Sequence, residues 1–178
     1  MHWLNEPAHW QAHDDEILVT ADPHTDFWRT THYGFIRDSG HFYHQATTGD
    51  FQLDVEVRGR YAAPRDQAGL MLRIDEQNWL KFSVEFVRGM LQVSAVATRE
   101  VSDESLLPLP GSPPVVWLRL LRRNEGVELF FSQDGRAYSR VRIAYFPPAA
   151  TVQAGLMAAA PEGADFQARF TGWRVRAV

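Results

Sequence analysis

The chain of 178 residues contains no cysteine. This absence excludes a disulfide framework, a thiol nucleophile and a cysteine-based zinc site. Long apolar segments are missing too, because no stretch reaches the ~20 uninterrupted apolar residues that a membrane helix needs. The opening residues, MHWLNEPAHWQAHDD, lack the apolar run that follows a basic start in a signal peptide. We therefore expect a cytoplasmic protein that has no membrane partner.

Positively charged residues are also fewer than negatively charged ones. The formal net charge is −4, and Lys81 is the only lysine in the chain. Duplex nucleic acid is bound by a clustered basic face, so no nucleic-acid partner is expected. A chain of this length can bury one sizeable core, and we predict a single domain over residues 1–178.

Helical periodicity is nearly absent, and alternation of period two takes its place. The alternating segments are FQLDVEVRG, QAGLMLRID, WLKFSVEFV, MLQVSAVAT, VVWLRLLRR, VELFFS, RVRIAYF, QAGLMAAA and FQARFTGWRVRAV. Turn residues such as Arg88-Gly89 and Asp134-Gly135 separate several of them, as in β-hairpins. Short strands joined by such turns predict an all-β fold, a two-sheet antiparallel jelly-roll sandwich. The residues expected between the sheets are Leu70, Leu72, Phe82, Val84, Leu118 and Leu120.

Two further patterns add detail to the predicted fold. The sequence QAGLM occurs at residues 67–71 and again at 153–157, which predicts two neighbouring strands in one sheet. A glycine inside a strand often marks close approach by another backbone or by a ligand. In the strand FQLDVEVRG, Asp54 and Glu56 share the face opposite the apolar residues, so we predict that both are solvated.

Several longer blocks carry a resemblance to a known family. These blocks are WLNEP, TDFW, THYGF, DQAGLMLRID, NWLK, EFV, WLRL, SQDG and GLMAA, spread over nearly the whole chain. They resemble the "regulation of enolase" family, whose function is not established and which is grouped with concanavalin A-like lectins and glucanases. The resemblance implies a concanavalin A-like jelly roll with one concave face. It implies no catalytic activity, and the family name alone suggests a metabolic enzyme as a partner.

The strand WLKFSVEFV supplies the first candidate site. If its apolar residues face the core, Trp79, Lys81 and Glu85 share the concave face, and Gln67 and Arg73 lie on the same face of the preceding strand. An aromatic ring beside charged and amide groups suits a neutral polyol or sugar. The alternative is a cross-strand charge network of Lys81, Glu85 and Arg73 beneath a loop.

The segment TDFWRTTHYGFIRDSGHF, residues 25–42, supplies the second candidate. Its two glycines predict an irregular loop, and loops on a rigid sandwich commonly carry binding groups. We predict that Trp28, His32 and Tyr33 form the rim of the cleft. Phe27, Phe35 and Phe42 are expected to pack at the end of the sandwich, and the alternative is that the whole aromatic set packs there.

Metal and cofactor sites are not indicated. All seven histidines precede residue 45, but no set of them shows a recognised ligand spacing, so we expect no metal and no cofactor. Glycoside hydrolysis requires two carboxylates, and the E-x-D-x-x-E arrangement of sandwich glucanases is missing. Glu85 is the best single candidate for a catalytic acid or base.

These features rank three functions. The first is a cytoplasmic carbohydrate-binding or sugar-sensing domain that uses the concave face. The second is a glycosidase-like or other sugar-active enzyme with Glu85 as acid or base. The third is a protein-interaction module that regulates a metabolic enzyme, an idea that the family name alone supplies.

Overall fold

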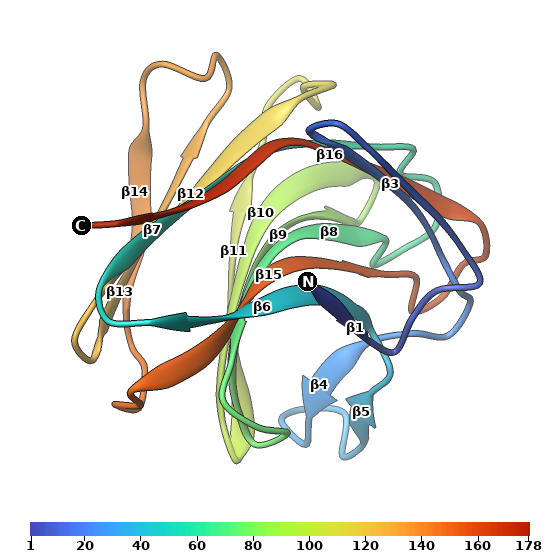
Figure 1. Ribbon diagram of the computed structural model, residues 1–178. Helices are drawn as coiled ribbons and strands as arrows, with labels where there is room; N and C mark the ends of the chain where they lie inside the picture. The colour runs from blue at the N-terminus through green and yellow to red at the C-terminus, as the bar shows by residue number, and fades with distance from the viewer.

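The strands form two large antiparallel sheets. The computed structural model describes residues 1–178 and contains no helix. Sheet A has the order β1 (His2–Leu4), β6 (His41–Thr48), β15 (Thr151–Ala159), β8 (Gln67–Arg73), β9 (Asn78–Val87), β10 (Met90–Arg99) and β11 (Val101–Pro108). Sheet B has the order β14 (Ser139–Tyr145), β13 (Gly126–Ser132), β12 (Val116–Arg123), β7 (Phe51–Gly59), β16 (Phe166–Ala177), β3 (Glu16–Ala21) and β2 (His9–His13). A separate pair, β4 (Phe27–Arg29) and β5 (Ile36–Asp38), lies beyond the two large sheets (Figure 1).

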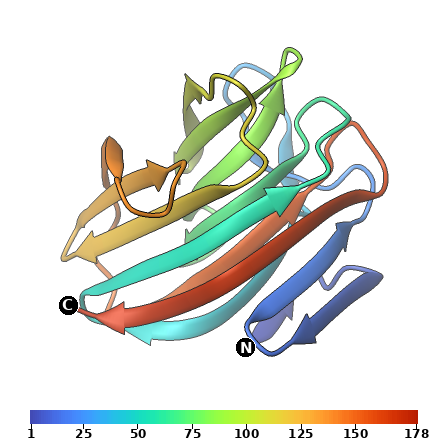
Figure 2. The same ribbon diagram turned by 90° about the horizontal axis from the view of Figure 1, so that it is seen from above.

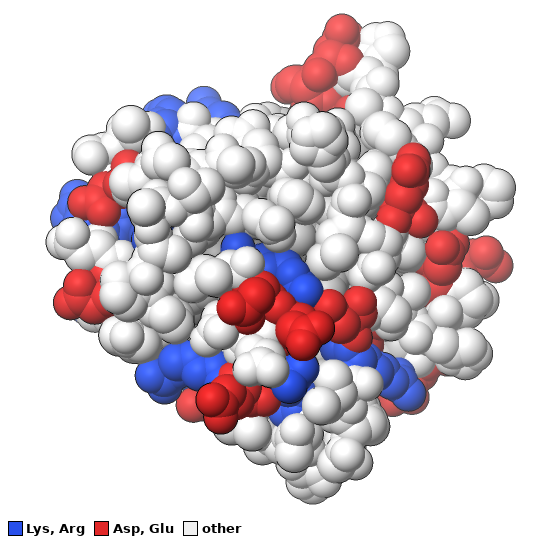
Figure 3. Space-filling view, turned by 60° about the horizontal axis from the view of Figure 1, so that its bottom comes forward, with Lys and Arg blue, Asp and Glu red and all other residues white.

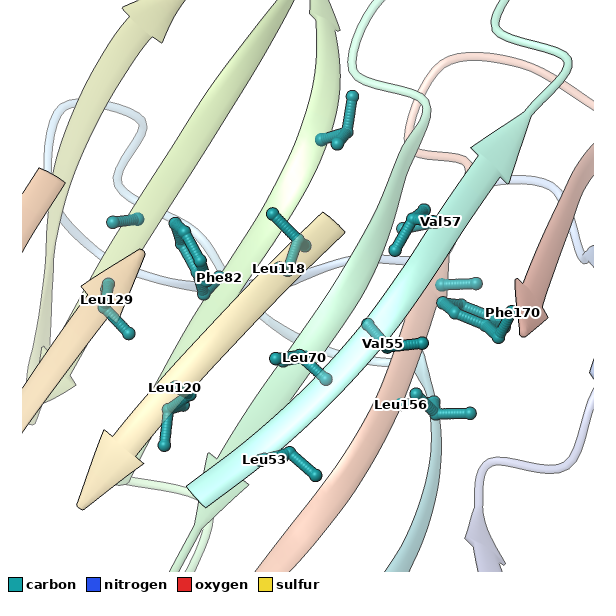
Figure 4. Packing of buried hydrophobic residues seen from close by; sticks show 14 of the residues in the cluster. Leu53, Val55, Val57, Leu70, Phe82, Leu118, Leu120, Leu129, Leu156 and Phe170 are labelled. Carbon is teal, nitrogen blue, oxygen red and sulfur yellow. The ribbon is translucent and has the colours of Figure 1, made fainter. Parts of the chain in front are cut away.

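The two sheets pack face to face around one apolar core. Figure 2 shows strands of sheet B side by side, with the long red β16 between β7 and the blue β3. The close view in Figure 4 shows Leu70 and Phe82 of sheet A pointing toward Leu118 and Leu120 of sheet B. The core residues predicted from the alternation are all buried here: Leu70, Leu72, Phe82, Val84, Leu118 and Leu120. The structure therefore confirms the all-β jelly-roll sandwich.

The repeated QAGLM segments form neighbouring strands, as predicted. β15 pairs with β8, and Gly155 lies opposite Met71 while Gly69 lies opposite Met157. A side chain at Gly69 would collide with the carbonyl oxygen of Phe82 on β9. Glycine is therefore required here by close approach of a neighbouring backbone, which is one of the two reasons expected for a strand glycine.

The prediction that Asp54 is solvated is wrong. This residue on β7 faces away from the core, but it is only 4% exposed. Its carboxylate accepts hydrogen bonds from Arg119 at 2.6 Å and from Arg176 at 2.8 Å, and Arg174 lies 3.8 Å away. Arginines on both neighbouring strands therefore cover a carboxylate that was expected to be solvated, whereas Glu56 is half-buried.

The outer face of sheet A has a cover of its own. Residues 22–40, which contain β4 and β5, fold across this face and are called the covering segment below. A second apolar cluster joins the segment to the sheet; its buried members are Phe27, Trp28, Phe42, Met71, Trp79, Val96, Met157 and Ala159. Arg73 reinforces the junction because its guanidinium donates two hydrogen bonds of 2.7 Å to Asp38 on β5.

The structure contains no helix, and therefore none that is long and apolar enough to cross a membrane.

Candidate functional site

A small cleft opens where the covering segment meets sheet A. Its volume is about 210 Å³. Figure 3 turns the side that carries β4 and β5 forward, and acidic and basic side chains gather at the centre of this view. The lining residues come from the covering segment, from strands β8, β9 and β11, and from two loops: Asp26, Trp28, Tyr33, Phe35, Arg37, Arg65, Gln67, Lys81, Glu85, Glu104, Pro161 and Glu162.

The floor of the cleft is polar and buried. Gln67 on β8 lies directly opposite Glu85 on β9 in the strand register, because alternation turns both side chains away from the sandwich core. Gln67 is 2% exposed and Glu85 is 1% exposed. The two side chains thus place an amide and a carboxylate next to each other in a site with little access to water.

Arg65 holds the polar side of the cleft together. Its Nη1 donates to Glu85 Oε1 at 2.8 Å and to Glu104 Oε1 at 3.0 Å, and its Nη2 donates to the hydroxyl of Tyr33 at 3.0 Å. Arg65 lies in the loop between β7 and β8 with a φ of 69°, a left-handed conformation that is uncommon for a residue with a side chain. The backbone strain is tolerated where the side chain gains three hydrogen bonds.

Two charged groups of this network, Glu104 and Arg65, have shifted pKa values. Burial, followed by the negative charge of Glu85, raises the pKa of Glu104 above its usual range. Burial lowers the pKa of Arg65, but its hydrogen bond and charge interaction with Glu85 outweigh that effect and leave the pKa above its ordinary value. The guanidinium therefore stays charged at every accessible pH.

Aromatic rings form the opposite wall. The ring of Tyr33 stacks on Phe35 with a centroid separation of 5.3 Å, and it meets the edge of Trp28 at 5.5 Å. The guanidinium of Arg37 lies over the Phe35 ring, 4.6 Å from its centre. Tyr33 is 47% exposed, so its ring is available to a ligand.

The single lysine serves mainly to fix this arrangement. Lys81 Nζ donates to the carbonyl oxygen of Phe27 at 2.9 Å and lies 3.4 Å from Asp26 Oδ1. Both partners belong to the covering segment, and Lys81 is 3% exposed. The ammonium group therefore ties the segment to β9 while it also borders the cleft.

Two acceptor atoms of the floor have no hydrogen-bond partner within the protein. They are Gln67 Oε1 and Glu85 Oε2. Buried polar atoms are usually paired, and leaving one unpaired costs about 1–3 kcal/mol.

The structure brings together five of the eight residues predicted for ligand binding. Trp28, Tyr33, Gln67, Lys81 and Glu85 line the cleft. The side chain of Trp79, in contrast, is fully buried in the second cluster and does not reach the cleft.

The other two predicted residues are also outside the cleft. The side chain of Arg73 is occupied by Asp38. His32 is exposed at a turn, with its ring edge-on to Tyr33 at 4.8 Å. Trp79 and Arg73 lie outside the cleft for the same reason: the covering segment packs onto the concave face instead of leaving it open.

Sequence patterns did not predict several residues of the cleft. The position of Glu104 could have been predicted, because Ser102, Glu104 and Leu106 follow one another at a spacing of two residues and therefore share one face of β11. Arg65 and Arg37 lie in irregular segments, where no periodicity indicates the direction of a side chain. Phe35 was expected to pack at the end of the sandwich; it packs instead against the second cluster, on the outer face of sheet A, and lines the cleft.

The buried histidine near the cleft has a structural role. His41 is 2% exposed, and its Nδ1 donates to the carbonyl oxygen of Asn5 at 2.6 Å. Its Nε2 accepts a hydrogen bond of 2.9 Å from the backbone of Asp22. No group of three or more histidine, aspartate or glutamate side chains in the chain is placed to hold a metal ion.

The paired carboxylates of Glu85 and Glu104 suit binding better than hydrolysis. Glu85 and Glu104 are close enough to share one guanidinium nitrogen of Arg65. A glycosidase needs one carboxyl group free to protonate the leaving oxygen and a second free to attack or to activate water. Here the same cation holds both groups, so the arrangement offers hydrogen-bond acceptors more readily than a catalytic pair.

Comparison with solved structures shows the fold in other proteins. The crystal structure of a functionally unknown protein from Saccharomyces cerevisiae has a TM-score of 0.96 at 36% identity, covering 99% of this chain and 96% of that chain. The carbohydrate-binding module CBM66 from Bacillus subtilis has a TM-score of 0.62 at 13% identity, covering 98% and 95%. The GH43 protein BlXynB from Bacillus licheniformis, a K247S mutant, has a TM-score of 0.76 at 14% identity, covering 97% of this chain but 36% of that chain.

Comparison with characterised sequences and family models confirms the resemblance drawn from the sequence blocks. "Regulation of enolase protein 1" from Saccharomyces cerevisiae is 37% identical over 175 residues, which cover 98% of this chain and 88% of the yeast protein. The model of the family described as "Protein of unknown function (DUF1349)" matches residues 3–178. The chain therefore belongs to this family of proteins of unknown function.

Proposed function

We propose that the protein is a cytoplasmic carbohydrate-binding domain and that the cleft beside Glu85 is its binding site. The observation that carries this proposal is the pairing of an aromatic wall with an acceptor-lined floor in one small cleft. Sugars present C–H faces that pack on aromatic rings and hydroxyl groups that need hydrogen-bond acceptors. Tyr33 would cover the ring of the sugar, while Gln67 and Glu85 would accept from its hydroxyls.

The size of the cleft limits the ligand. Pockets for drug-sized molecules span roughly 300–1,000 Å³, and this cleft has about 210 Å³. A single sugar ring or a short polyol is therefore the expected ligand. A long polysaccharide would have to place one terminal residue in the cleft, because the covering segment packs across the concave face beside it.

The relatives give this proposal limited support. A carbohydrate-binding module shares the fold, although its 13% identity carries no residue-level argument. The name of the yeast relative supports a second candidate, in which the domain senses a small sugar and regulates a metabolic enzyme. In both candidates the same cleft binds the ligand, so ligand binding is the first property to test.

A thermal-shift screen against single-ring sugars and polyols would test the proposal. A ligand at 100 times its dissociation constant stabilises a folded protein by ~2.7 kcal/mol, which raises the melting temperature measurably. We expect at least one sugar to stabilise the wild type and Tyr33→Ala to abolish the effect. Tyr145→Ala is the matched control, because Tyr145 is equally exposed but lies on β14, away from the cleft. A screen in which no sugar stabilises the wild type would contradict the proposal.

A further inference from the structure

The charges of the cleft are unequal, and most of the positive ones are already used. Four carboxylates border it, from Asp26, Glu85, Glu104 and Glu162, against the three cations Arg37, Arg65 and Lys81. Arg65 is bound to Glu85 and Glu104, and Lys81 on β9 is bound to the covering segment. Arg37 lies over the ring of Phe35. An anionic ligand would therefore meet more carboxylate than unpaired positive charge.

Because the two atoms without a partner are acceptors, a ligand at the floor of the cleft must donate hydrogen bonds. Gln67 Oε1 and Glu85 Oε2 belong to side chains that are at least 98% buried and that lie opposite each other on adjacent strands. The carboxyl group of Glu85 is buried and has Arg65 as its one ion-pair partner. A buried carboxylate oxygen gains more from a charged donor than from a neutral hydroxyl, because charge-assisted hydrogen bonds are about twice as strong.

We propose that the cleft selects an amino sugar, with its ammonium group directed at Glu85 and Gln67, over neutral and acidic sugars. This inference rests on the proposed function, since it specifies the ligand of the same site. An ammonium group has three donors and no acceptor, which matches two acceptors that lack a partner. The exposed ring of Tyr33 adds a face that attracts cations. An acidic sugar would instead place its negative charge near Glu104 and Glu162, where like charges repel.

Isothermal titration with four probes tests the inference on the intact chain. The probes are glucose, glucosamine, glucuronic acid and cyclohexylamine, which has the ammonium group and the ring but no hydroxyls. We expect glucosamine to bind at least tenfold more tightly than glucose and glucuronic acid to show no binding. Cyclohexylamine is expected to bind more weakly than glucosamine, because it has the charge without the hydroxyl contacts.

Two variants identify the group that provides the preference. Glu85→Gln keeps the shape of the side chain but removes its charge, so the preference for glucosamine over glucose should fall about tenfold. If this buried substitution prevents folding, Glu162→Gln replaces it, because Glu162 is exposed at the edge of the cleft and its loss should weaken the same preference by a smaller factor. Glu128→Gln on sheet B, outside the cleft, is the control and should leave all four affinities unchanged.

The outcomes separate this inference from the proposed function. If glucose or glucuronic acid binds as tightly as glucosamine, the amine preference is wrong and the carbohydrate function stands. If cyclohexylamine binds and none of the sugars does, the preference for an ammonium group stands and the carbohydrate function is wrong. If none of the four probes binds, both are contradicted.

Discussion

Replacing Trp79 with alanine should destabilise the protein strongly. The side chain is fully buried, and its ring lies 6.0 Å from that of Phe27 in the cluster that joins the covering segment to sheet A. Truncation of a buried tryptophan or phenylalanine to alanine typically costs about 3–5 kcal/mol, through lost transfer free energy and the cavity left behind. For a domain of this size each kcal/mol lowers the melting temperature by roughly 2–4 °C, so a fall of about 6–20 °C is expected.

The assay is urea unfolding of the wild type and three variants, followed by tryptophan fluorescence and circular dichroism. Trp79→Phe should cost less than Trp79→Ala, because it keeps most of the ring and removes an indole N–H that has no partner in the protein. Tyr33→Ala, a change at an exposed ring, should lower the free energy of unfolding by less than about 1 kcal/mol. A loss below about 1 kcal/mol for Trp79→Ala would refute the reasoning, because the ring would then not be packed in the cluster.

Three further predictions concern the cover, the charges and the strand packing. Arg73→Met removes the two bonds to Asp38, so hydrogen exchange in residues 22–40 should become faster, and unchanged exchange would show that the pair does not hold the covering segment. Because burial and then the charge of Glu85 raise the pKa of Glu104, the folded state binds this proton more tightly than the unfolded state does. The wild type should therefore lose stability relative to Glu104→Gln as urea unfolding is moved from about pH 4 to about pH 7, and a difference that stays constant would contradict the shift. Gly69→Ala should prevent folding or lower the melting temperature sharply, because its methyl group would collide with a carbonyl oxygen of β9; a melting temperature close to that of the wild type would contradict this packing.

The alternating pattern predicted which residues share a face, because a strand has a side-chain period of two. It placed Leu80, Phe82 and Val84 in the core and Lys81 and Glu85 on the opposite face, and the structure confirms both assignments. Alternation alone does not say what covers the opposite face. The covering segment is irregular over most of its length, so no period in residues 22–40 predicts that it would bury Trp79.

Asp54 and Arg65 show the same limit in two other places. The partners of Asp54 come from β12 and β16, strands far apart in the sequence, and the register of β16 shifts between Thr171 and Arg174. Arg65 reaches Glu85 and Glu104 from a loop in which its left-handed backbone sets the direction of the side chain. Both networks depend on strand order and loop geometry, which are three-dimensional properties that local sequence patterns do not contain.

A crystal structure of the protein soaked with glucosamine tests the central claim most directly. The account predicts electron density for the sugar in the cleft, with its amino group within hydrogen-bond distance of Glu85 Oε2 and Gln67 Oε1. The ring of the sugar should lie against Tyr33. A sugar bound elsewhere on the surface, or an empty cleft at a concentration that saturates binding in solution, would contradict the claim that this cleft is the binding site.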